Sequence, residues 1–125
     1  MSTRAQVRFA TREAGVSFND HPDKIHAQFY VHSDGYPEGL GLDIATSYAD
    51  RVKLSKGWEI EHIQTKHGDL DFIYYIWSDY DKDTWISIFS VVPFSRVEPG
   101  GEQLGECIFV GKPNKLIAKY DEKRD

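Results

Sequence analysis

The chain has few residues that could stabilise it through covalent or metal cross-links. Its 125 residues include a single cysteine, Cys107, which excludes an internal disulfide and is typical of a reducing compartment. No run of about 18 apolar residues occurs that could span a bilayer, and the polar residues 1–6 do not resemble a secretory leader. We therefore expect a soluble protein of the cytoplasm, with no membrane as a partner.

Positive charge is also scarce. The chain has 15 Lys and Arg residues against 20 Asp and Glu residues, which gives a net charge of −5. Because a general nucleic-acid binder needs an excess of basic residues facing the phosphates, this composition argues against nucleic acid as a partner. An acidic surface favours basic partners. The length and the globular composition predict one domain over residues 1–118, followed by a charged, frayed tail over residues 119–125.

Alternating apolar and polar residues predict strands over residues 5–10 and 25–32, joined as a long hairpin. Residues 72–77 are apolar at both parities, which predicts a central strand covered on both sides. A strand over residues 85–92 pairs with it across an acidic turn, and residues 103–111 form a last strand. A further short strand at residues 58–64 is optional.

Over residues 40–54, the apolar residues recur at the spacing of an amphipathic helix. Pro37 and Glu38 suit the start of this helix, since proline lacks an N–H and a carboxylate is favoured near a helix N-terminus. The element order β-β-α-β-β-β predicts an α+β fold, a mostly antiparallel sheet of about five strands with this helix packed on one face. One helix cannot cover both faces, so the other face must be polar, curled over or buried against a partner.

No motif predicts a cofactor or a metal. Gly39-Leu40-Gly41 begins like a dinucleotide-binding fingerprint, but Ile44 occupies the third glycine position. The aspartates of residues 79–83 have the spacing of a calcium loop without its glycine or its glutamate. The histidines do not have zinc-ligand spacing. We expect no cofactor and no metal site.

The turn over residues 32–41 holds the densest group of candidate binding residues, namely His32, Asp34, Tyr36 and Glu38. His32 and Asp34 could act as a general base and its orienting carboxylate. A hydrogen bond from His32 to the turn and a capping role for Asp34 are the ordinary alternatives. Because no activated nucleophile is apparent, we expect no catalytic residue and favour a protein that is not an enzyme.

Two further groups are candidates for binding. Arg4, Arg8 and Arg12 share one parity of the first strand and would form a solvent-facing basic stripe, unless neighbouring carboxylates neutralise it. The aromatic residues of the second hairpin could lie in the core or at an interface; they are Tyr74, Tyr75, Trp77, Tyr80 and Trp85.

The segment Tyr30-x-His32-x-Asp34-Gly35-Tyr36-Pro37-x-Gly39-x-Gly41 resembles a turn of small, uncharacterised phage and prophage proteins. The resemblance covers about the first 45 residues, and this chain departs from it at Ser33, where those proteins tend to carry tryptophan. The resemblance implies a virus-encoded accessory protein acting in the bacterial host cytoplasm. It implies no catalytic residue.

These observations predict a non-enzymatic protein-binding module that engages a host protein, such as a defence component, through its acidic surface and sheet aromatics. Two alternatives remain open: a small-ligand binder or enzyme using the turn at His32 and Asp34, and a nucleic-acid contact protein using the arginine stripe. Exposed edge strands would also allow a homodimer.

Overall fold

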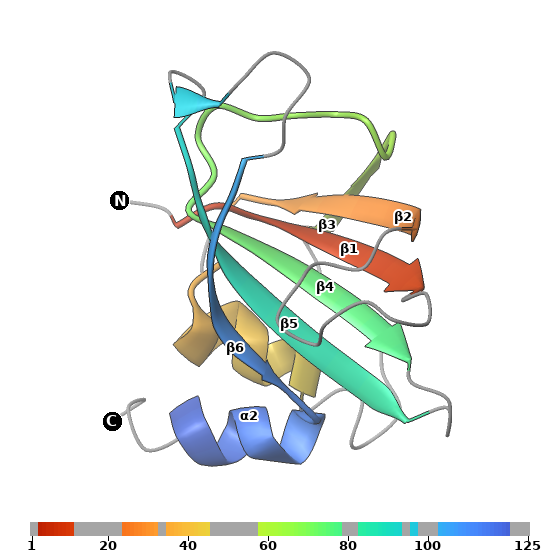
Figure 1. Cartoon of the computed structure of the whole chain (residues 1–125), viewed down its shortest axis with the longest axis vertical. Coiled ribbons are helices and arrows are strands. Elements are labelled where there is room, and N and C mark those ends of the chain that lie inside the picture. The colour runs from red at the N-terminus through yellow and green to blue at the C-terminus, as the bar shows by residue number, and fades with distance from the viewer. Residues whose placement is uncertain are drawn as a thin grey trace.

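The computed structural model describes residues 3–11, 24–32, 35–45, 58–78, 83–93, 96–97 and 103–120. These residues form one sheet of six strands in the order β3-β2-β1-β4-β5-β6 (Figure 1). The strands are β1 (Ala5–Thr11), β2 (Lys24–Val31), β3 (Trp58–Glu61), β4 (Phe72–Ser78), β5 (Thr84–Val91) and β6 (Leu104–Gly111). The α+β class and both predicted hairpins, β1–β2 and β4–β5, are confirmed.

The sheet has six strands and one parallel pair, so the prediction of a mostly antiparallel sheet of about five strands is correct in its main direction and differs in these two details. β1 and β4 pair in parallel, with Ala5 opposite Phe72 and Phe9 opposite Ile76, and the other four neighbouring pairs are antiparallel. The optional strand predicted at residues 58–64 is present over its first four residues as β3, at one edge of the sheet. Because β3 and β4 run in the same direction with β2 and β1 between them, residues 62–71 must cross over these two strands.

Two helical segments lie on the same face of the sheet (Figure 1). The first begins at Pro37 with η1 (Pro37–Gly41), a π-helical turn in which the N–H of Leu42 bonds to Pro37 O, and it continues as α-helix through residues 42–45. Residues 46–54 of the predicted helix lie outside the described residues. The second segment, α2 (Pro113–Tyr120), is not predicted by the sequence, and it includes Lys119 and Tyr120, which we assigned to the tail. Residues 121–125 also lie outside the description.

The helical segments bury the larger core cluster against this face. Leu40 and Ile44 of the first segment and Leu116 of α2 pack on Val7, Tyr74 and their neighbours. A second cluster lies on the opposite face and includes Ile73, Tyr75, Trp77 and Phe89. Every residue from Ile73 to Trp77 is therefore buried, as expected for a central strand covered on both sides.

Candidate functional site

The predicted turn cluster is divided between the two faces of the sheet. The N–H of Gly35 donates to Thr3 O over 2.9 Å, and Tyr74 Oη donates to Gly35 O over 2.6 Å, so the turn is anchored to the residues before β1 and to β4. His32 lies on the opposite face from the helices, where its Nε2 is 2.9 Å from Glu59 Oε1. Asp34 lies outside the described residues.

Glu38 acts on the helix-covered face. Burial, followed by the negative charges of Tyr120 and Glu38, raises the pKa of Tyr74 well above its ordinary value. Burial and Glu38 also raise the pKa of Tyr120. Because Glu38 faces these tyrosines while His32 faces Glu59, the described residues of the turn do not converge on one site. Tyr36, with 39% of its surface exposed, is accessible to a partner.

Arg8 does not face the solvent, which corrects the prediction for this member of the arginine stripe. Arg8 is only 3% exposed, and its Nη1 and Nη2 donate to Tyr75 Oη (2.6 Å) and Gln6 Oε1 (3.1 Å). Arg4 forms an ion pair with Asp69 over 3.0 Å, the neutralisation that the acidic composition favours. Arg12 lies outside the described residues.

The aromatic residues of the second hairpin serve packing. Tyr74, Tyr75 and Trp77 are buried, and Trp85 is half-buried. Trp77 stacks on Trp85 with ring centroids 5.3 Å apart, and its Nε1 donates to Ser87 Oγ over 2.9 Å. Tyr80 lies outside the description. Among the described members of this set, Tyr74, Tyr75 and Trp77 therefore lie in the core and do not form an exposed binding surface.

A row of polar side chains crosses the sheet on the face opposite the helices. Successive cross-strand partners are Glu61, Gln28, Arg8, Tyr75 and Ser87, one from each strand from β3 to β5. We call this set the polar row. Since an unpaired buried polar group is costly, such a row must be held by hydrogen bonds.

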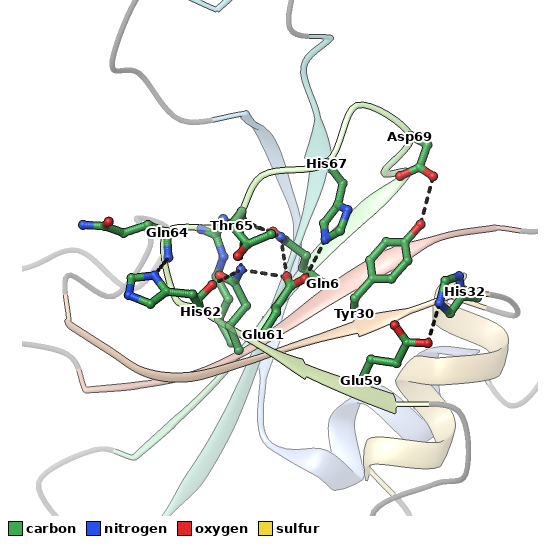
Figure 2. A network of polar contacts seen from close by, with 12 residues as sticks. Gln6, Tyr30, His32, Glu59, Glu61, His62, Gln64, Thr65, His67 and Asp69 are labelled. Atoms are coloured by element: carbon green, nitrogen blue, oxygen red, sulfur yellow. Dashed lines mark hydrogen bonds and ion pairs between the residues drawn. The ribbon is translucent and has the colours of Figure 1, made fainter.

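Glu61 links the polar row to the crossover segment 62–71 (Figure 2). Its Oε1 accepts from the Nε2 atoms of Gln6 (2.9 Å) and Gln28 (2.8 Å), and its Oε2 is 2.6 Å from His67 Nε2. The same two glutamines donate to Thr65 O over 2.9 and 3.0 Å. Two buried amides therefore bind both the side chain of β3 and the backbone of the crossover.

Tyr30 extends this network toward the other end of the crossover. Its ring stacks on His67 with centroids 4.0 Å apart and meets His32 edge-on, and its hydroxyl donates to Asp69 Oδ2 over 2.9 Å. Burial, followed by the hydrogen bond to Asp69 and the charge of Asp69, raises the pKa of Tyr30 to about 12. The tyrosine is therefore neutral at physiological pH and acts as a hydrogen-bond donor.

A cavity of about 310 Å³ lies between the polar row and the crossover segment. Arg8 lines it from the sheet, and Ile63, Gln64, Thr65 and Lys66 line it from the crossover. Within the described part of the chain, no set of three or more His, Cys, Asp or Glu residues is arranged to hold a metal ion.

The second feature of this region is the edge formed by β3. Three large hydrophobic residues are exposed among those described, and two of them, Ile60 (76%) and Ile63 (42%), lie in or just after β3. Ile60 is opposite Phe29 on the helix-covered side of the sheet, whereas Glu59 is opposite Tyr30 on the polar side. At this edge, Ile60 therefore places an apolar side chain on one face of the sheet and Glu59 places a carboxylate on the other.

Sequence reasoning missed Gln6, Gln28, Glu61 and His67 as members of one network. A signal for part of it was present in the alternation of the two strands. Gln28, Tyr30 and His32 occupy one side of the predicted strand over residues 25–32, and Gln6 and Arg8 occupy one side of the strand over residues 5–10. No local sequence pattern indicated that the crossover segment 62–71 would cover these side chains.

The chain matches no family model, and comparisons with curated proteins and with solved structures found no match. No helix in the described ranges is long and apolar enough to cross a membrane.

Proposed function

We propose that the protein is a non-enzymatic protein-binding module that uses the outer strand β3 as its contact strand. In this proposal, an extended segment of the partner adds to the sheet beside residues 58–61. The observation that carries the proposal is Ile60, a large aliphatic side chain that is 76% exposed on an edge strand. Edge strands carry outward-facing backbone N–H and C=O groups, which form main-chain hydrogen bonds with an added strand.

The side chains of β3 define the chemistry of the partner segment. An apolar residue would pack on Ile60 on one face, and a Lys or Arg would lie opposite Glu59 on the other. Glu59 has a side chain that is 62% exposed, so it is accessible to such a cation even while it pairs with His32. The partner segment therefore alternates basic and apolar residues, in line with the net charge of −5.

The same charges disfavour a second copy of the chain as the occupant. Antiparallel pairing of two β3 strands centred on Ile60 would place Glu59 of one copy opposite Glu61 of the other. Like charges directly opposite each other destabilise a strand pair. A foreign basic strand avoids this repulsion.

The resemblance of the first 45 residues to small phage and prophage proteins supports a bacterial host protein, such as a defence component, as the partner. Nucleic acid is disfavoured because Arg8 is buried and Arg4 pairs with Asp69. The small-ligand alternative at the turn has less support among the described residues, because His32 pairs with Glu59 instead of converging with Glu38.

The experiment is affinity purification from an infected bacterial lysate with the unmodified chain and two variants. Ile60→Glu adds a charge at the proposed contact, and Asn114→Glu adds the same charge at an exposed position of α2. We expect one stoichiometric protein with the unmodified chain and with Asn114→Glu, and its loss with Ile60→Glu. Equal recovery with both variants would reject β3 as the contact strand, and repeated recovery of nothing would reject the protein-binding function.

A further inference from the structure

The two carboxylates of β3 are not equally available to a partner. Glu59 and Glu61 lie two residues apart on the same face of the strand. The side chain of Glu59 is mostly exposed, whereas that of Glu61 is only 12% exposed. A strand that pairs with β3 would pass both residues, so this difference decides which of its own side chains is recognised.

Glu61 is already occupied by side chains of the same molecule. It is directed into the network beneath the crossover segment (Figure 2), where its Oε1 accepts from Gln6 and Gln28. Its Oε2 is 2.6 Å from His67 Nε2. A lysine from a partner would have to displace one of these donors and lose its own hydration at a largely buried position, which offsets the attraction between the two charges.

Glu59 retains an oxygen for a partner. Its Oε1 is 2.9 Å from His32 Nε2, and its Oε2 has no hydrogen bond within the part of the chain that the structure describes. Because a carboxylate accepts at both oxygens, Oε2 can bind a Lys or Arg while the contact with His32 is kept. Residues directly opposite each other on two paired strands are close enough for such an ion pair.

We propose that β3 recognises a single basic residue of the partner strand, a Lys or Arg opposite Glu59, next to an aliphatic residue opposite Ile60. The position opposite Glu61 takes a small neutral residue such as threonine. This inference rests on the proposed function, since it requires a strand to add beside β3. It narrows the partner from an alternating basic and apolar segment to one adjacent pair of residues.

The test uses four short, capped peptides as probes, with the central triplets Lys-Ile-Thr, Thr-Ile-Lys, Lys-Ile-Lys and Thr-Ile-Thr between identical threonine flanks. The first two have the same net charge and allow for either strand direction. Binding to the ¹⁵N-labelled full chain is followed by amide chemical shifts at constant ionic strength. Saturable shifts at residues 58–61 locate each peptide on β3.

We expect the better of the two single-lysine peptides to bind about threefold to fivefold more tightly than Thr-Ile-Thr, as for one exposed ion pair. The second lysine of Lys-Ile-Lys should add at most about a factor of two, because it permits both strand directions without a second ion pair.

Two variants assign the preference for lysine to one carboxylate. Glu59→Gln removes the charge and keeps the size of the side chain, so it should reduce the affinity for the better single-lysine peptide to that for Thr-Ile-Thr. Glu106→Gln removes the same charge from an exposed position of the opposite edge strand β6 and should keep the preference. Melting temperatures check that both variants are folded.

The possible failures separate this inference from the proposed function. Shifts at residues 58–61 with equal affinity for all four peptides would reject Glu59 as the selecting residue and leave β3 as the contact strand. A gain from the second lysine as large as that from the first, or a preference for lysine that persists in Glu59→Gln, would have the same meaning. Absence of these shifts with every peptide up to about 10 mM would reject the contact strand itself, and this inference with it.

Discussion

At the scale of single residues, the glycine of the turn shows how closely two segments approach. A Cβ on Gly35 would lie 2.9 Å from Ala5 Cβ and 3.0 Å from Thr3 O. By contrast, a Cβ on Gly41 would meet Leu116 Cδ2 at 3.5 Å, an ordinary contact. The two glycines of one turn therefore have different roles, and only the first is required by close packing.

Gly35→Ala should lower the free energy of unfolding by roughly 1–3 kcal/mol, because the backbone of β1 must shift to accommodate the methyl group. Urea unfolding followed by circular dichroism measures this change. Gly41→Ala is the matched control and should remain within about 1 kcal/mol of the unmodified chain. Equal stability of the two variants would contradict the role of Gly35.

Tyr30 predicts a loss of stability in alkaline solution. Its pKa is raised from 10.0 in the unfolded chain to about 12 in the folded chain, so the folded state holds the proton more tightly. This contribution is fully present below pH 10 and is lost as the pH rises through 12. This difference in pKa corresponds to roughly 2–3 kcal/mol in the free energy of unfolding.

Thermal unfolding of the unmodified chain and of Tyr30→Phe between neutral pH and pH 12 measures this contribution. The variant should be less stable at neutral pH, because Asp69 loses its donor, and should lose less stability on alkalinisation. The raised pKa of Tyr74 leaves some pH dependence in both proteins. Parallel curves for the two proteins would show that Tyr30 does not contribute.

At the scale of elements, the crossover segment depends on one carboxylate. Glu61 accepts hydrogen bonds from two buried glutamines and binds His67, whereas Glu59, two residues away, binds only His32 at an exposed position among the described residues. The two glutamates of one short strand therefore differ in what their removal should do.

Glu61→Ala should destabilise the chain by about 2–4 kcal/mol, since it removes the charged acceptor of two buried amides and leaves them the backbone acceptor Thr65 O. Glu59→Ala should cost less than about 1 kcal/mol, as for other exposed ion pairs. Hydrogen exchange is the second measurement, and in Glu61→Ala the amide of Thr65, which bonds to His62 O, should exchange faster. Similar losses in both variants would show that the polar row does not hold the crossover.

The sequence predicts well those elements in which the apolar residues follow a regular local spacing. The apolar run Phe72–Trp77 becomes a central strand, and Leu40, Ile44 and Ala45 are buried as the helical spacing predicts. The helix α2 was missed because it has only eight residues and runs into the charged stretch that we assigned to the tail. The alternation in β1 could not show that Arg8 is buried, because its hydrogen-bond partner Tyr75 lies 67 residues further along the chain.

At the scale of the whole molecule, the polar face of the sheet is covered in part by the chain itself. The sequence indicated that one helix could not cover both faces. It could not indicate that residues 62–71 would cross β1 and β2, since this depends on the parallel pairing of β1 with β4. The order of strands in a sheet is set by long-range contacts, which have no local signature.

We predict that the isolated chain is a monomer, because pairing of two β3 strands would place Glu59 of one copy opposite Glu61 of the other, and the two carboxylates would repel each other. Sedimentation velocity at increasing protein concentration measures this directly. Glu59→Thr removes the repulsion and adds a residue favoured in strands, so it should shift the sedimentation coefficient toward that of a dimer.

Glu106→Thr, an exposed change on the opposite edge strand β6, is the control and should remain monomeric. Dimerisation of the unmodified chain through β3 would contradict the assignment of this edge to a basic foreign strand.

The parallel pair at the centre of the sheet has a consequence for synthesis on the ribosome. Arg8 and Tyr75 are 67 residues apart in the chain and become neighbours only when β4 has been made. Until then the first hairpin emerges with one flank of β1 unpaired, a state in which nascent chains attract chaperones and misassociate. Slowing translation between residues 11 and 72 should therefore reduce the soluble yield, whereas slowing it after residue 78 should have little effect.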